Sequence, residues 1–371
     1  MSTRATLRPD AAVDRLAVAA YTIPADRPES DGTAEWTSTT VVVVEAFGGG
    51  RCGTGYTYGP AAAGAVVEEL LADVVTGSDV MDVRAVWLAM AKALRNAGRP
   101  GLGSMAMAAV DLALWDLKAR LLERPLATVL GAARRAVPVY GSGGFTSYSP
   151  DEVADQLGAW VADGIPRVKM KIGRSGFDDV RRVAAAREAV GDAAELMVDA
   201  NGAYDRAEAL GWADRLAHEW AVTWFEEPVP SDDPDGLRAV HDRCPPGMEI
   251  AAGEYGYVLS DFRTLVESGG IDCLQADVTR CGGITGLLQV GGLALGHGMD
   301  ISGHCAPAAS MHAFCALEGA RHLEWFHDHV RIEAMLFEGS PVPAGGAIAP
   351  DLSRPGNGLE LRRADAERFA A

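Results

Sequence analysis

Three segments of the chain, RVKMKI at residues 167–172, LMVDAN at 196–201 and TWFEEP at 223–228, decide the fold. Each segment is a short apolar run that ends in charged or amide side chains, and an amphipathic segment of helical length separates it from the next. Strands that alternate with amphipathic helices are typical of parallel β/α units. The same pattern continues on both sides of these three segments.

The alternation extends from residue 137 to residue 326. Strands are predicted at 137–142, 167–172, 196–200, 223–227, 249–253, 273–278, 300–303 and 323–326, and helices at 151–163, 177–190, 205–219, 234–243, 259–268, 283–297 and 308–321. Eight strands alternating with seven helices predict a parallel barrel of right-handed units. An open doubly wound sheet is the competing fold, but it has fewer strands and carries a phosphate-binding glycine fingerprint. Gly141-Ser142-Gly143-Gly144 lacks that spacing, and we expect it to form a plain turn.

The first 130 residues follow a different pattern. Strands are predicted at 16–21, 39–47 and 51–58, and helices near 61–74, 81–97 and 103–123. Three strands followed by three helices predict an α+β unit. The tail, 340–371, is rich in Gly and Pro and offers no further β/α unit, so we expect it to pack on the N-terminal unit.

The charge and the cysteines exclude several classes of protein. The chain has 371 residues, with 33 Lys and Arg against 51 Asp and Glu, which gives a formal charge of −18. This excess of acid argues against binding to nucleic acid or to an anionic membrane, since both need a cationic face. No apolar run approaches the length of a membrane span, and no signal-type apolar core follows the N-terminus. The six cysteines show no CxxC spacing, so we expect reduced thiols in a cytoplasmic protein.

Charged side chains at the carboxyl ends of the predicted strands break the rule that a buried strand is apolar. In a parallel barrel these ends meet at one rim, where barrel enzymes place their chemistry. Asp199, Glu226 and Glu254 end three consecutive strands, and such a cluster of oxygen ligands suits Mg²⁺. A ring of carboxylates neutralised by Lys and Arg alone is the alternative. Glu249 is a weaker ligand because it lies at the start of its strand, at the opposite end of the barrel.

Candidate acids and bases flank this cluster. Lys169 and Lys171 are two residues apart on one strand, so they face the same way. A neighbouring ammonium and a dication both disfavour protonation, so we expect Lys171 to have a lowered pKa and to act as a base. On the other side, Asp277 is expected to hold one ring nitrogen of His304 and to leave the other as acid or base. Glu324 on the eighth strand can donate a hydrogen bond if its surroundings keep it protonated.

These residues lie in motifs that resemble the enolase superfamily, and within it the mandelate racemase subgroup. The Lys-x-Lys pair and the His–Asp dyad mark that subgroup, and the resemblance covers nearly the whole chain. The motifs, in chain order, are DLALWDLK (111–118), VKMKIG (168–173), DAN (199–201), WFEEP (224–228), AGE (252–254), ADVTRCGGIT (276–285), His304 and LE (323–324).

The resemblance implies a (β/α)7β TIM-like barrel over residues 131–330, with an N-terminal α+β capping domain over residues 1–130. The C-terminal segment, 331–371, would return to complete the capping domain. The capping domain of this family supplies specificity loops, which correspond here to 22–37 and 53–59.

The resemblance also implies a role for each site residue. The three Mg²⁺ ligands would be Asp199, Glu226 and Glu254, and the two bases would be Lys171 and His304. Lys169 would hold the substrate carboxylate. Asn201, Tyr56 and Tyr58 are expected to contact the substrate as well.

The implied reaction is Mg²⁺-dependent removal of the α-proton of a small carboxylate. Return of a proton by the other base gives racemisation or epimerisation, whereas protonation of a leaving β-hydroxyl by His304 gives dehydration. Tyr56, Tyr58, His327, His329 and Arg331 offer partners for sugar hydroxyls, which favours dehydration of a sugar acid; surface residues of a wet loop are the alternative.

Two other functions stay open from the residues alone. One is a lyase that uses Lys171 as a Schiff-base nucleophile, and the other is a non-catalytic barrel that binds a metal or an anion. In each case we expect a homo-oligomer.

Overall fold

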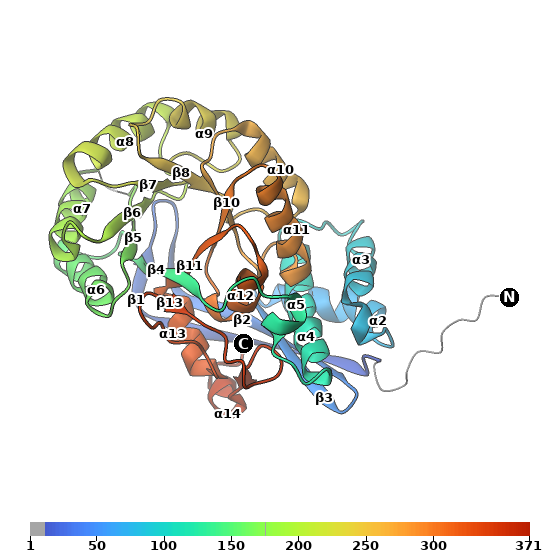
Figure 1. Cartoon of the computed structure of the whole chain (residues 1–371). Coiled ribbons are helices and arrows are strands. Elements are labelled where there is room, and N and C mark those ends of the chain that lie inside the picture. The colour runs from blue at the N-terminus through green and yellow to red at the C-terminus, as the bar shows by residue number, and fades with distance from the viewer. Residues whose placement is uncertain (1–11, 175) are drawn as a thin grey trace.

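A closed barrel of eight parallel strands is the centre of the structure (Figure 1), a computed structural model that describes residues 12–174 and 176–371. The barrel closes because β11 pairs with β4 as well as with β10, with Leu323 opposite Val139. The strands are β4 (Val137–Gly143), β5 (Arg167–Lys171), β6 (Glu195–Asp199), β7 (Trp224–Glu226), β8 (Glu249–Ala252), β9 (Cys273–Ala276), β10 (Asp300–Gly303) and β11 (Ala320–Phe326).

Seven helices connect these strands and surround them (Figure 1). Two of the helices begin with capping boxes, at Ser149 and Asp205. In each box the side chain of the first residue accepts from a backbone amide three residues later, and the side chain of that later residue accepts from the first residue's amide. The predicted (β/α)7β barrel is therefore confirmed. The helices are α6 (Pro150–Ala162), α7 (Gly176–Val190), α8 (Arg206–Trp220), α9 (Pro234–His241), α10 (Leu259–Ser268), α11 (Gly283–Gly296) and α12 (Pro307–Ala316).

The glycine cluster at 141–144 was expected to be a turn, and this prediction is wrong. Gly141 and Gly143 lie within β4. A Cβ on Gly141 would come within 2.6 Å of the ring of Trp160 on α6, so the glycine is needed for close approach of helix and strand.

The N-terminal unit contains an antiparallel sheet of β1 (Arg15–Ser30), β2 (Glu35–Gly48) and β3 (Arg51–Tyr58). The prediction that 22–37 and 53–59 are loops is wrong. Residues 22–30 and 35–37 belong to the strands of the β1–β2 hairpin, and residues 53–58 belong to β3. The hairpin pairs Glu29 with Trp36 beyond an irregularity after Pro24, so proline and charge near its tip do not end the strands.

Helices of the N-terminal unit pack against this sheet. A Cβ on Gly55 of β3 would lie 2.2 Å from the carbonyl oxygen of Ala109, so that glycine lets the long helix α4 lie directly on the strand. The helices are α1 (Ala62–Val66), a π-helical turn (Val67–Leu71), α2 (Ala72–Val75), a 3-10 turn (Val80–Asp82), α3 (Val83–Ala93), α4 (Leu102–Leu121) and α5 (Leu126–Leu130).

The C-terminal segment contacts both units. β13 pairs antiparallel with β4, and the amide of Ala371 donates to the carbonyl of Ala20 in β1 at 3.0 Å. The domain boundaries at residues 130 and 330 stay predictions. The elements of this segment are α13 (His327–Leu336), β12 (Phe337–Glu338), β13 (Ala347–Ile348), β14 (Glu360–Leu361), α14 (Arg363–Ala366) and a 3-10 turn (Glu367–Phe369).

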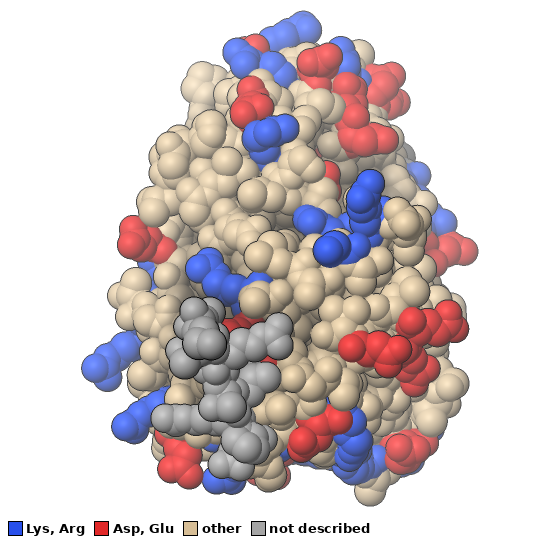
Figure 2. Space-filling model, turned by 90° about the vertical axis from the view of Figure 1, so that its right-hand side faces the viewer, with Lys and Arg blue, Asp and Glu red and all other residues tan. Residues whose placement is uncertain are grey.

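The surface carries charges of both signs (Figure 2), and the cysteines are unpaired. On the face shown in Figure 2, Lys and Arg are interspersed with Asp and Glu over a largely uncharged surface. All six cysteines are free thiols. Within residues 12–174 and 176–371, the helices are too short or too polar to traverse a bilayer.

Buried His312 makes the stability of the fold dependent on pH. Its Nδ1 accepts from the amide of Ala127 at 3.1 Å and its Nε2 donates to the carbonyl of Asn357 at 3.0 Å, so the neutral ring satisfies both. Burial lowers the pKa of His312 from 6.5 to about 4. Between these two values the unfolded chain binds more protons than the folded one, so stability falls as the pH falls.

Because of His312, we expect the free energy of unfolding to be about 2 kcal/mol lower at pH 5 than at pH 7. Urea unfolding of the wild type and of His312→Gln at both pH values measures this contribution as the difference between their pH dependences. His218→Gln, which changes an exposed histidine on α8, should retain the wild-type dependence. Equal pH dependence in wild type and His312→Gln would contradict the assignment.

Candidate active site

Three carboxylates gather at the carboxyl ends of consecutive barrel strands. Asp199 ends β6, Glu226 ends β7 directly opposite it, and Glu254 follows β8 by two residues. All three are buried, and one carboxylate oxygen from each lies within 4.8 Å of the others. Glu249, at the start of β8, instead pairs with Arg321 at the opposite end of the barrel, as predicted.

The cluster fits a hard divalent cation. Its donors are all oxygen, and Glu254 Oε2 is buried without a hydrogen bond from the described residues. Burial and the neighbouring Asp199 raise the pKa of Glu226 to about 8, which reflects the crowding of negative charge. A Mg²⁺ ion would relieve this repulsion, since it prefers carboxylate oxygens and keeps some of its waters.

The lysine pair lies against this cluster. Lys169 Nζ is 2.6 Å from Glu226, 3.0 Å from Glu324 and 3.5 Å from Asp199. Lys171 Nζ is 2.5 Å from Asp199 Oδ2. Burial lowers the pKa of Lys171, but Asp199 and the other carboxylates outweigh burial and raise it. In the chain alone the pKa of Lys171 therefore moves opposite to the prediction, which assumed a bound dication, because the carboxylates that would bind that cation instead stabilise the ammonium.

His304 and Asp277 form the predicted dyad. Asp277 lies just after β9, not within the strand as predicted, and its Oδ2 is 2.9 Å from His304 Nδ1. Its other oxygen accepts from the amide and the hydroxyl of Thr279, both at 2.7 Å. These bonds fix the imidazole, and its Nε2 faces Glu254 Oε2 at 3.2 Å, an ion-pair distance. The metal cluster and the imidazole therefore share one site.

The surroundings of Glu324 favour its ionised form, so the condition under which it was expected to donate a hydrogen bond, a protonated carboxyl, is not met. Burial raises its pKa, but Lys169 and His304 outweigh burial and hold the pKa well below its usual range. Its oxygens accept from the hydroxyl of Ser142 at 2.6 Å and from the amide of Cys305 at 2.8 Å. Glu324 therefore accepts hydrogen bonds here.

Asn201 is held beside the metal cluster. Its backbone amide donates to Asp199 Oδ1 at 2.8 Å. Its φ of +47° is one that asparagine tolerates better than most residues. Its side-chain oxygen is buried with no partner among the described residues, which leaves it available to a substrate.

Tyr56 and Tyr58 have protein partners. The Tyr56 hydroxyl donates to Glu333 Oε1 at 2.6 Å, and the Tyr58 ring stacks on His329 with ring centroids 3.5 Å apart. His329 and Glu333 belong to α13, so the wet loop considered after the eighth strand is a helix. As substrate contacts, both tyrosines remain predictions.

Two residues of the site were not singled out from the sequence. Arg280 Nη1 donates to the carbonyl of Glu254 at 3.1 Å, and its Nε is 3.7 Å from Asp277 Oδ2. Cys305 places its Sγ 3.3 Å from His304 Nε2. The three-residue spacing from Asp277 to Arg280 and the adjacency of Cys305 to His304 were the available signals.

Comparisons with known protein families found two matches, which together cover most of the chain. Residues 20–131 match the family described as mandelate racemase / muconate lactonizing enzyme, N-terminal domain. Residues 152–366 match the family described as enolase C-terminal domain-like.

Individual relatives cover almost the entire chain. The chain is 32% identical over 360 residues to the 3,6-anhydro-alpha-L-galactonate cycloisomerase of Streptomyces coelicolor, which covers 94% of this chain and 97% of that protein. The structure of a mandelate racemase/muconate lactonizing enzyme-like protein from Rubrobacter xylanophilus is similar with a TM-score of 0.95 and 58% identity, over 97% of this chain and 100% of that one.

A further similar structure contains ligands. It is the L-talarate/galactarate dehydratase of Salmonella typhimurium LT2, liganded with Mg and L-lyxarohydroxamate, with a TM-score of 0.90 and 28% identity over 100% of this chain and 96% of that one. The matching families, these relatives and the shared barrel lead to one conclusion: the chain belongs to the mandelate racemase/muconate lactonizing enzyme family of the enolase superfamily.

Proposed function

We propose that the chain is a Mg²⁺-dependent enzyme that removes the α-proton of a sugar acid and then expels its β-hydroxyl as water. The observation that carries this proposal is the position of the three-carboxylate cluster, which contacts Lys171 through Asp199 and His304 through Glu254. A carboxylate held at the cluster would therefore have an amine and an imidazole within reach.

Asp199, Glu226 and Glu254 would hold the metal. Bound Mg²⁺ supplies positive charge that stabilises the negative charge developing on a substrate carboxylate as its α-proton leaves. Lys169, already among Glu226, Glu324 and Asp199, adds a second cation for the same carboxylate. Asn201 is placed to orient the substrate through its free side-chain oxygen.

Lys171 would accept the α-proton and His304 would donate a proton to the leaving hydroxyl. Lys171 can act as a base only after it loses its own proton, which requires the charge of Asp199 to be engaged elsewhere. Asp277 holds His304 Nδ1, which leaves Nε2 facing the site for proton donation. Glu324 contacts Lys169 and accepts from the Cys305 amide, which keeps both in place.

The named relatives support a sugar acid as substrate. One similar structure is a talarate/galactarate dehydratase, whereas the Streptomyces coelicolor relative is a cycloisomerase. Cycloisomerisation is therefore the second candidate. It would rearrange the substrate without loss of water. A homo-oligomer and a cytoplasmic location stay predictions.

A library of sugar acids and 2-hydroxy acids in D₂O with Mg²⁺ tests the proposal. We expect one or a few sugar acids to lose one water and to gain deuterium, as read by mass spectrometry and proton NMR, and we expect a chelator to abolish both changes. A product of unchanged mass but new connectivity would support the cycloisomerase. Turnover that persists after chelation, or a substrate adduct trapped on Lys171 by borohydride, would overturn the proposal.

A further inference from the structure

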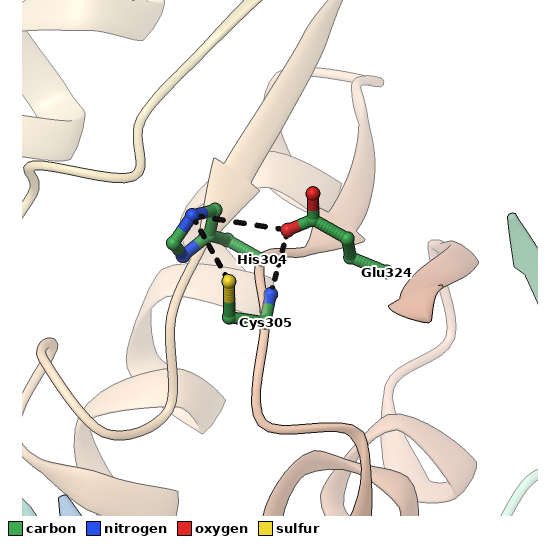
Figure 3. Close-up of side chains that lie close together, drawn as sticks. All are labelled: His304, Cys305 and Glu324. Atoms are coloured by element: carbon green, nitrogen blue, oxygen red, sulfur yellow. Dashed lines mark hydrogen bonds and ion pairs between the residues drawn. The ribbon is translucent and has the colours of Figure 1, made fainter. Parts of the chain in front are cut away.

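His304, Cys305 and Glu324 form a second cluster of metal-binding donors beside the carboxylate cluster. Figure 3 shows the imidazole, the thiol and the carboxylate turned toward one another; His304 and Cys305 directly follow β10, and Glu324 lies within β11. His304 Nε2 is 3.3 Å from Cys305 Sγ and 3.7 Å from Glu324 Oε2, and the three ligand atoms all lie within 4.8 Å of one another. All three residues are buried, and none of them belongs to the proposed Mg²⁺ ligands.

The two distances measured from His304 Nε2 match those of a tetrahedral metal site. Zinc bonds of about 2.0–2.3 Å place neighbouring ligands roughly 3.3–3.8 Å apart in a tetrahedron. The two distances from His304 Nε2 fall in this range. Three protein ligands would leave a fourth position for water.

Electron-rich atoms surround His304 Nε2 on several sides. Besides Cys305 Sγ and Glu324 Oε2, Glu254 Oε2 lies 3.2 Å away and accepts no hydrogen bond from the described residues. Such surroundings favour positive charge at that nitrogen. A proton on the ring supplies it, and so does a metal ion with affinity for nitrogen and sulfur.

The chemistry of the donors favours one kind of ion. Imidazole and thiolate select borderline-soft ions such as Zn²⁺ over Mg²⁺, which prefers oxygen ligands. We propose that His304, Cys305 and Glu324 form a zinc site distinct from the Mg²⁺ site, and that Zn²⁺ bound there inhibits the enzyme by occupying Nε2 of His304. Binding would release the thiol proton and any proton on Nε2 to solvent. The inhibition rests on the proposed function, whereas the binding does not.

Cobalt is a spectroscopic substitute that tests binding without any substrate. Wild-type protein saturated with Mg²⁺ and titrated with Co²⁺ should develop a thiolate-to-cobalt charge-transfer band that saturates at one equivalent, and Zn²⁺ should remove it. Cys305→Ala and Cys305→Ser should lack the band. Cys244→Ala, which removes a half-buried thiol on the outside of the barrel, should keep it. Absence of the band in wild-type protein would overturn the zinc site.

Inhibition is measured under saturating Mg²⁺ with the sugar acid that the library experiment identifies. Removal of one of three direct ligands in Cys305→Ala should raise the Zn²⁺ concentration for half inhibition by at least about 100-fold, the upper end of the cost of losing an outer-shell partner, when each variant is compared with its own rate without Zn²⁺. Cys244→Ala should match the wild type. Inhibition that persists in Cys305→Ala and disappears as Mg²⁺ is raised would place Zn²⁺ at the carboxylate cluster and overturn the inhibitory role.

Discussion

Replacement of Lys171 by Met is expected to lower kcat by about 100- to 10,000-fold, the range that a positioned general base contributes. The methionine keeps much of the volume of the side chain but has no amine to receive the α-proton. Steady-state kinetics with the acid found in the library measures the loss. Lys92→Met, which changes an exposed lysine on α3, should retain wild-type activity.

A measurement of Mg²⁺ binding shows whether Lys171→Met loses activity because the base is missing or because the site is disrupted. Calorimetric titration should show that Mg²⁺ still binds, because the variant removes a cation that competes for Asp199 Oδ2. His304→Gln should also lose dehydration but continue to exchange the α-proton with D₂O through Lys171. Lys171→Met with more than a tenth of the wild-type kcat would refute the role of this lysine.

The second large effect is expected from Asp199→Asn. This change keeps the shape of the side chain but removes one negative charge from the proposed Mg²⁺ ligands and from the partner of Lys171. We expect Mg²⁺ affinity to fall by at least about 100-fold, the upper end of the cost of losing an outer-shell partner. Turnover at moderate Mg²⁺ should fall with it. Calorimetry and the Mg²⁺ dependence of kcat/KM measure the two effects.

Glu249→Gln is the matched control for Asp199→Asn. Glu249 is an acid on a barrel strand, but it lies at the opposite end and pairs with Arg321. Its half-exposed ion pair contributes at most about 1 kcal/mol to stability, so the variant should fold and keep its Mg²⁺ affinity. Full activity of Asp199→Asn would refute the metal site, and an equal loss in both variants would point to a general effect of charge.

The barrel, and the residues that lie at its rim, could be predicted from local sequence. Alternation of strands with amphipathic helices depends on periodicities that neighbouring residues set, and parallel strands bring all their carboxyl ends to one rim. This topology suffices to group Asp199, Glu226, Glu254, Lys171 and His304 before any distance is known. The expected positions of these side chains agree with the structure, whereas their catalytic roles stay predictions.

Protonation states and pairings across the fold were beyond the reach of local patterns. Asp199, 2.5 Å from Lys171, raises the pKa of that amine, and Lys169, 3.0 Å from Glu324, lowers the pKa of that carboxyl. Residues 22–30 and 35–37 belong to paired strands, and Tyr56 meets Glu333 from a helix far along the chain. Coulomb energies vary with distance and burial, and strand pairing depends on a partner strand. Protonation states and strand pairings therefore depend on how residues far apart in the sequence pack together. Patterns among neighbouring residues do not specify that packing.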